Sequence, residues 1–179
     1  MLKIALLGIG NMGKNHLRIL SMLKGVEICS IFDVNESELK KLSAQYNVPY
    51  TLNMDEAIEG VDAVLIVTST STHFDYFSKC VGKVKNIFVE KPLAATYEDA
   101  CLMEELACKH QTFVQCGFIE RFNPVVSALK NVLSEREVIN MDFTRTNRLS
   151  SRISDVDVVL DLMIHDLDLA LFKEDIWSH

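Results

Sequence analysis

The chain has 179 residues, of which 49% are hydrophobic and 24% charged, enough to bury one full core and part of another. Its formal net charge of -7, with no long lysine or arginine run, argues against a nucleic-acid partner. Glycines interrupt the first apolar run, which excludes a signal peptide, and no stretch reaches the roughly 20 apolar residues of a membrane span. We therefore expect a cytoplasmic protein with no membrane partner.

The first apolar run leads from Ile4 directly into the segment GIGNMG at 8–13, which has the spacing G-x-G-x-x-G. In this pattern the glycines permit a tight turn, a close approach of backbone to a pyrophosphate, and close packing of the following helix. The helix N-terminus then offers N–H groups to the phosphates. The alternative is a glycine-rich turn that binds no nucleotide. The cofactor contacts that we expect from this loop are Gly8, Gly10, Asn11, Met12 and Gly13.

A helix over 12–24 and a second apolar strand over 26–32 follow, and the strand ends at Asp33. A carboxylate at this distance from the glycine loop can accept hydrogen bonds from a ribose diol. It also repels a 2′-phosphate, and no arginine directly follows it. We therefore predict NAD as the cofactor in preference to NADP.

Helical and buried-strand patterns continue to alternate along the chain, which predicts an α/β fold with a Rossmann-type doubly wound parallel sheet. Asn35 is the expected N-cap of one helix, with Glu38 completing a capping box, and Thr96 caps another. We expect helices over 36–46, 54–59, 73–81 and 97–110, and strands over 63–67, 86–89 and 112–116, with a short extended piece over 48–51 and a loop over 68–72.

The pattern changes near residue 118, so we predict a Rossmann domain over 1–118 and a second domain over 119–179. The second part carries helical patterns over 124–133 and 156–172 and an alternating strand pattern over 137–146. One strand cannot make a sheet. We therefore expect a truncated α+β substrate domain, unless a partner chain completes it.

Two segments follow buried strands and should lie at the ligand-binding edge of the parallel sheet. Glu90 and Lys91 come directly after the strand over 86–89, and a lysine there can donate to a substrate oxygen. The alternative is a surface lysine at the start of a loop. The hydroxyl-rich segment after the strand over 63–67 suits a ribose or adenine contact, or a helix cap by Ser71 or Thr72. Its cofactor-binding candidates are Thr68, Ser69, Thr70 and His73.

Asp161 and His165 are four residues apart on a strongly apolar helix, so they share one face. Histidine is the usual proton acceptor near neutral pH. The alternative is a structural Asp–His hydrogen bond, and Asp166 and Asp168 fit a structural or solvated role. A metal site from Asp161, His165 and Asp166 has an undistinguished ligand set, so we predict no metal.

The five cysteines are odd in number and lack C-x-x-C spacing, which favours small buried side chains in a reducing compartment.

Taken together, these motifs resemble the Gfo/Idh/MocA oxidoreductases, a family that includes glucose–fructose oxidoreductase and inositol dehydrogenase. The segments that carry the resemblance are GIGNMG with His16, Asp33, TSTSTH at 68–73, EKP at 90–92, GFIERFNP at 117–124 and DLMIHDLD at 161–168. The resemblance implies NAD(P)-dependent hydride transfer to or from a sugar or cyclitol hydroxyl, and a homo-oligomer formed through a large second-domain sheet. It implies that Lys91 contacts the reacting oxygen, that His165 is the general acid/base and that Asp161 positions the substrate.

Within the family, the segments 117–126 and 148–156 are most similar to the branch that oxidises the 3-hydroxyl of UDP-N-acetylglucosamine. A diphosphate substrate needs cations and hydrogen-bond donors, and several arginines in this part of the chain could supply them. An equally good interpretation is that these arginines only form a solvent-exposed face. The substrate-binding candidates are Arg121, Asn123, Arg148 and Arg152, with Arg145 as a further cation. Ser69 stands where the family usually has proline, and family chains are nearly twice this length. The alternative function is therefore a non-catalytic dinucleotide-binding or regulatory module, or a truncated inactive homologue.

Overall fold

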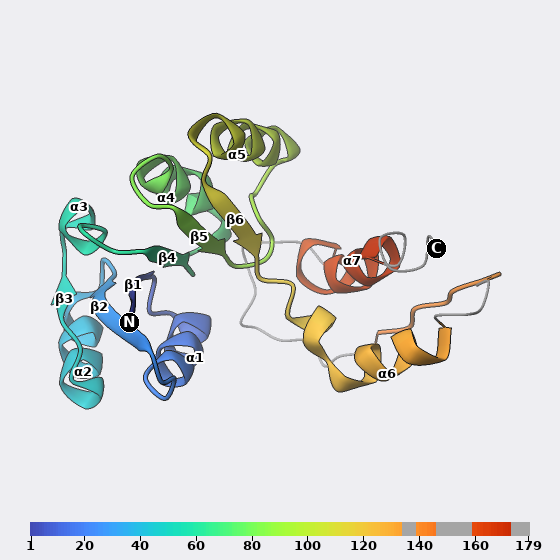
Figure 1. The fold of residues 1–179 in the computed structure, drawn as a ribbon, viewed down its shortest axis with the longest axis horizontal. Helices are drawn as coiled ribbons and strands as arrows, with labels where there is room; N and C mark the ends of the chain where they lie inside the picture. Colours follow the sequence, from blue (N-terminus) through green and yellow to red (C-terminus); the bar gives the residue numbers. More distant parts are fainter. Residues whose placement is uncertain (134–138, 146–158, 173–179) are drawn as a thin grey trace. The chain divides into compact units, whose positions relative to one another are not determined.

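The computed structural model describes residues 1–133, 139–145 and 159–172. The chain divides into two compact units, Met1–Gly117 and Phe118–His179. The first unit contains a parallel sheet with helices on both faces, and the described part of the second unit is helical (Figure 1). No helix in the described ranges is both long enough and apolar enough to cross a lipid bilayer.

A six-stranded sheet with the order β3-β2-β1-β4-β5-β6 forms the centre of the first unit, and all its strand pairs are parallel. This is the strand order of a doubly wound dinucleotide-binding sheet, so the predicted α/β class is confirmed. The order reverses between β1 and β4, and ligands of such sheets bind beyond the carboxyl ends of the strands at this point. The strands are β1 (Leu2–Leu7), β2 (Val26–Phe32), β3 (Tyr50–Thr51), β4 (Ala63–Ile66), β5 (Asn86–Val89) and β6 (Phe113–Cys116).

Helices cover both faces of this sheet, α1 and α2 on one face and α4 and α5 on the other (Figure 1). Side chains alternate along β1: Ile4 and Leu6 pack with α1 and α2, whereas Ala5 and Leu7 pack in the cluster that contains α4 and α5 residues. Burial on both faces explains why the strand is a continuous apolar run in the sequence. The helices are α1 (Asn11–Leu20), α2 (Glu36–Tyr46), α3 (Met54–Ala57), α4 (His73–Cys80) and α5 (Tyr97–His110), with a short 3-10 helix, η1, at Thr70–Thr72.

Two helix starts have the predicted side-chain caps. The Asn35 side chain accepts from the Glu38 backbone N–H at 3.2 Å, and Thr96 Oγ1 accepts from the Asp99 N–H at 3.1 Å. The second half of the predicted capping box at Asn35 is absent from the structure. The Glu38 carboxylate instead pairs with the Lys14 ammonium at 2.7 Å, which links α2 to α1 and lowers the pKa of Glu38.

The second unit consists of a 3-10 helix, η2 (Ile119–Phe122), then α6 (Pro124–Leu133), and a π-helical turn, η3 (Val159–Met163), that continues into α7 (Ile164–Phe172). The predicted strand over 137–146 is wrong for its described part, since 139–145 has no regular secondary structure. A strand needs a neighbour for its backbone groups, and none of the described residues of this unit lies in a sheet.

None of the five cysteines, all of which lie in the described residues, forms a disulfide, but the expectation of buried side chains holds only for Cys80. Cys29, Cys101 and Cys116 are half-buried, and Cys108 is exposed. Cys80, the last residue of α4, lies in the core of the first unit, and burial raises the pKa of its thiol to about 12. It therefore stays protonated and unreactive at physiological pH, and it fills the core as a small apolar side chain.

Candidate functional site

The glycine loop lies at the switch point of the sheet, between the end of β1 and the start of α1. Gly8 has a φ of 94°, and a Cβ there would lie 2.5 Å from the carbonyl oxygen of Val67. A Cβ on Gly13 would overlap the carbonyl oxygen of Gly8, so this glycine allows α1 to pack against the loop. A Cβ on Gly10, in contrast, would meet nothing within 4 Å. The open space is therefore at the central glycine, where a pyrophosphate would approach the backbone.

The start of α1 is suited to bind an anion. Its N-cap, Gly10, supplies no capping side chain, and the first turn carries no acidic residue. The N–H groups of a first helical turn have no partner within the helix, and the helix dipole is positive at this end. Asn11 and Met12, which begin the helix, are exposed. These features fit the phosphates of a dinucleotide.

The Asp33 carboxylate lies beside the glycine loop at the end of β2. Its Oδ2 accepts from the Ile9 N–H at 2.8 Å, and its Oδ1 accepts from the Asn35 N–H at 2.9 Å. These two bonds fix the carboxylate in orientation and tie it to the loop. Each carboxylate oxygen can accept more than one hydrogen bond, so capacity remains for a ribose diol.

The hydroxyl-rich segment after β4 forms η1, and hydrogen bonds between its own residues stabilise it. Thr72 Oγ1 hydrogen bonds to Thr68 Oγ1 at 2.9 Å and donates to the Ser69 carbonyl at 2.8 Å. The expected cap of α4 by the Thr72 side chain is therefore absent. Ser69 is exposed and Thr70 half-buried, so both remain candidates for cofactor contact.

His73 lies between the loops that follow β4 and β5. Its side chain is 1% exposed, and its ring nitrogens lie 2.9 Å from the Pro92 carbonyl oxygen and 3.1 Å from the Thr68 carbonyl oxygen. The ring therefore joins the loop after β4 to the loop after β5. Both partners are carbonyl oxygens, so the ring can donate to either loop and stabilises their packing; the predicted cofactor contact of His73 stays a prediction.

The segment Glu90–Pro92 follows β5 at the same edge of the sheet, with a cis peptide bond between Lys91 and Pro92. The Glu90 Oε2 accepts from the Lys91 backbone N–H at 3.0 Å, and its Oε1 lies 2.8 Å from Nε2 of His16 on α1. Lys91 is half-buried. The helix that begins at the glycine loop and the loop that carries Lys91 are thus directly connected. The sequence alone does not reveal this connection, because 74 positions separate the two partners.

Two arginines in the described part of the second unit pair with carboxylates, Arg121 with Asp168 and Arg145 with both Asp166 and Glu120. Arg121 Nε donates to Asp168 at 2.8 Å, Arg121 Nη2 donates to the other oxygen, and the guanidinium lies 5.1 Å from the Phe118 ring centroid. Arg145 donates to Asp166 at 2.8 Å. The guanidinium fork of Arg121, which we expected to hold a substrate diphosphate, is therefore occupied by Asp168.

Asn123, whose role in substrate binding stays a prediction, hydrogen bonds within its own segment. Its Oδ1 accepts from the Val125 N–H at 3.0 Å, and its Nδ2 donates to Glu120 at 3.2 Å. Both ends of the amide are engaged at the start of α6. The other predicted substrate contacts, Arg148 and Arg152, lie outside the described residues.

Asp161 lies in the π-helical turn η3 and His165 in the first turn of α7. The described part of the predicted single helix thus begins with a wider π-helical turn, a feature that often occurs at functional sites. His165 is 9% exposed and Asp161 half-buried. Across the described residues, no group of three His, Cys, Asp or Glu side chains could hold a metal ion.

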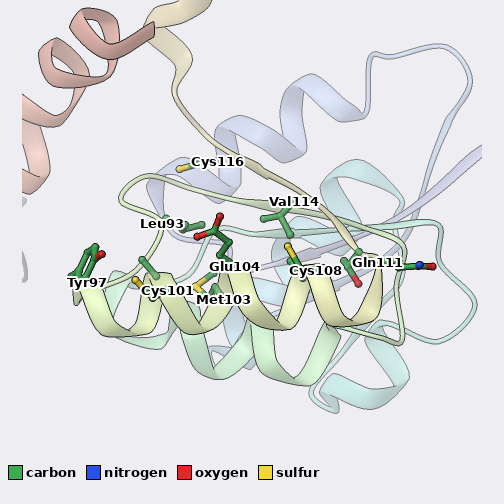
Figure 2. A pocket seen from close by; sticks show the side chains of 12 residues that line it. Leu93, Tyr97, Cys101, Met103, Glu104, Cys108, Gln111, Val114 and Cys116 are labelled. Atoms are coloured by element: carbon green, nitrogen blue, oxygen red, sulfur yellow. The ribbon is translucent and has the colours of Figure 1, made fainter. Parts of the chain in front are cut away.

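A groove of about 620 Å³ lies elsewhere in the first unit, between α5 and β6. Cys108 of α5 and Val114 of β6 face one another across it (Figure 2). None of the glycine-loop residues lines the groove, and its only charged side chain is Glu104. A largely apolar groove whose one charged lining residue is acidic does not suit the phosphates of a dinucleotide, so we do not take it as the candidate cofactor site.

A family model described as "Oxidoreductase family, NAD-binding Rossmann fold", that of the Gfo/Idh/MocA proteins, matches residues 2–118. The chain belongs to the Gfo/Idh/MocA family. This confirms the resemblance drawn from the glycine loop and the EKP segment, and it identifies the first unit as an NAD-binding domain.

Individual relatives carry related names. The UDP-N-acetylglucosamine 3-dehydrogenase of Acidithiobacillus ferrooxidans is 28% identical over 170 residues, which cover 95% of this chain and 53% of the relative. The inositol 2-dehydrogenase of Acidothermus cellulolyticus is 28% identical over 176 residues, which cover 93% of this chain and 52% of the relative. A solved structure of the Acidithiobacillus enzyme aligns with a TM-score of 0.82 at 27% identity, and the alignment covers 96% of this chain and 56% of that structure's chain. The chain therefore spans about half the length of the relatives it matches.

Proposed function

We propose that this chain provides the cofactor site and part of the active site of an NAD-dependent dehydrogenase that oxidises a sugar hydroxyl. The proposed substrate is a UDP-N-acetylhexosamine, with reaction at C3. The observation that carries the proposal is the placement of Lys91 at the carboxyl edge of the sheet, joined through Glu90 and His16 to the helix of the glycine loop. The similarity to a UDP-N-acetylglucosamine 3-dehydrogenase over nearly the whole chain supports the choice of substrate.

In the proposed mechanism, the N–H groups at the start of α1 bind the pyrophosphate and the Asp33 carboxylate binds the ribose diol. Bound NAD supplies the hydride acceptor. Lys91 donates a hydrogen bond to the reacting oxygen and stabilises the negative charge that develops there. His165 accepts the hydroxyl proton, and Asp161 orients the substrate. The role of the protein is to hold the reacting groups in position and to move one proton.

The proposal is tested by incubating the purified chain with NAD and UDP-N-acetylglucosamine and following the absorbance of reduced nicotinamide. We expect reduction with this substrate and little with myo-inositol, together with a keto-sugar product by mass spectrometry. Lys91→Met should abolish the reaction, whereas Lys85→Met, which removes an exposed lysine just before β5, should not. NAD binding without oxidation of either substrate would instead support a non-catalytic dinucleotide-binding module.

The preference for NAD over NADP is assigned to Asp33. Asp33→Asn should lower the ratio of the NADP to the NAD dissociation constant by about tenfold, because it removes the charge that repels a 2′-phosphate. Affinity for NAD should also fall, since the carboxylate no longer accepts both from Ile9 and from the ribose. Calorimetric titration of both cofactors measures the ratio. An unchanged ratio would show that cofactor choice depends on other residues.

A further inference from the structure

The Glu90 carboxylate is held from three sides within the first unit. His16 Nε2 lies 2.8 Å from Oε1, and the Lys91 backbone N–H donates to Oε2 at 3.0 Å. The third side is Gly117, where a Cβ would lie 3.0 Å from Oε2 and 2.9 Å from the Phe88 ring. The absence of a side chain at Gly117 therefore leaves room for the carboxylate. A carboxylate packed in this way can transmit a displacement of one partner to the other.

His16 is itself fixed at both its ring and its backbone. Its ring packs edge-on against Phe88, with centroids 5.4 Å apart, and its side chain is 23% exposed, against 12% for Glu90. It lies on α1, one turn beyond Gly13, so it moves with the helix whose first turn faces the pyrophosphate site. The rest of the Lys91 loop is tied to the sheet, because the Glu90 N–H donates to the Ile66 carbonyl at 2.9 Å.

We propose that His16 is a positioning residue, which through Glu90 couples occupation of the dinucleotide site to the placement of Lys91. The inference rests on the proposed function in so far as Lys91 acts on the substrate. In this arrangement a dinucleotide that orders the start of α1 also orders His16, and His16 fixes the carboxylate that holds the Lys91 backbone. His16 touches neither the cofactor nor the substrate, and it acts only through Glu90.

The coupling is tested first without turnover, by amide hydrogen exchange on the full chain followed by NMR. His16→Ala should speed exchange of the Lys91 amide by about tenfold, as expected for a weakened hydrogen bond to a charged group. Exchange of the Val89 amide in the β5 ladder should stay unchanged. Saturating NAD should slow Lys91 exchange in the native chain but not in His16→Ala. His16→Gln, which retains a donor for Glu90, should behave like the native chain.

Asn15→Ala is the matched control, because Asn15 is an exposed neighbour on the same helix and its side chain donates locally, to the Met12 sulfur. It should alter none of these rates. Equal acceleration at Lys91 and Val89 in His16→Ala would show a general loss of stability and would overturn the proposal. An unchanged exchange rate of the Lys91 amide in His16→Ala would also overturn the proposal.

The second measurement is steady-state kinetics with NAD and the sugar nucleotide. His16→Ala should lower kcat by about tenfold and change the KM for NAD by less than about twofold, and His16→Gln should restore kcat. A loss confined to the KM for NAD would contradict a positioning role. If the native chain oxidises no sugar, the proposed function fails, yet the exchange rates still decide whether His16 controls Lys91.

Discussion

His165→Ala should lower kcat for sugar oxidation by about 10²–10⁴-fold, the usual contribution of a positioned general base. As hydride leaves the carbinol carbon, the hydroxyl proton must be accepted, and we assign this step to His165. The side chain is 9% exposed at the start of α7, so water has little access to the imidazole. The NAD dissociation constant should change by less than about twofold, since the dinucleotide site belongs to the first unit.

The pH dependence gives a second test of this role. A protonated imidazole cannot accept a proton, so the native rate of oxidation should fall as the pH drops below neutrality. This fall, the acid limb of the pH–rate profile, should be missing from the residual activity of His165→Ala. His110→Ala removes an exposed histidine at the end of α5 and should leave both kcat and the limb intact. A native acid limb that persists in His165→Ala would assign proton transfer to another group.

Gly13→Ala should destabilise the first unit by about 2–3 kcal/mol, the cost of forcing a methyl group into a closely packed site. Its Cβ would overlap the Gly8 carbonyl oxygen, so α1 must move away from the end of β1. Urea unfolding followed by circular dichroism measures the change. NAD affinity should fall as well, because the same movement displaces the helix N-terminus.

Gly10→Ala is the matched control for this variant and separates folding from binding. A Cβ on Gly10 meets no protein atom within 4 Å, so stability should change by less than about 0.5 kcal/mol. The methyl group would nevertheless occupy space that a pyrophosphate needs, and NAD affinity should fall by about tenfold or more. If Gly10→Ala binds NAD normally, the cofactor does not approach this loop.

The elements of the first unit could be predicted because their signals are local in the sequence. A strand buried on both faces, such as β1, is a continuous apolar run, and the caps at Asn35 and Thr96 join residues three positions apart. The glycine loop has fixed spacings for the same reason. Each of these patterns depends on neighbouring residues, so no knowledge of the tertiary structure is needed.

The partners of the polar side chains could not be predicted in this way. His73 contacts Pro92, 19 positions away, and Arg121 contacts Asp168, 47 positions away. Neither pair follows from periodicity, and in each case the contact involves a candidate site residue. Alternation and the β-branched and aromatic residues over 137–146 predict a strand, but a strand also depends on the neighbours with which it pairs.

The two backbone hydrogen bonds to Asp33 have a consequence for protein engineering. The carboxylate that would select the ribose also anchors Ile9 in the glycine loop and Asn35 at the cap of α2. Under the role that we propose for Asp33, cofactor preference and loop geometry depend on one side chain and cannot be varied independently. A variant designed for NADP would need a second substitution that supplies a new acceptor for the Ile9 N–H. Without it, any gain in recognition of the 2′-phosphate would come with a poorly ordered pyrophosphate loop.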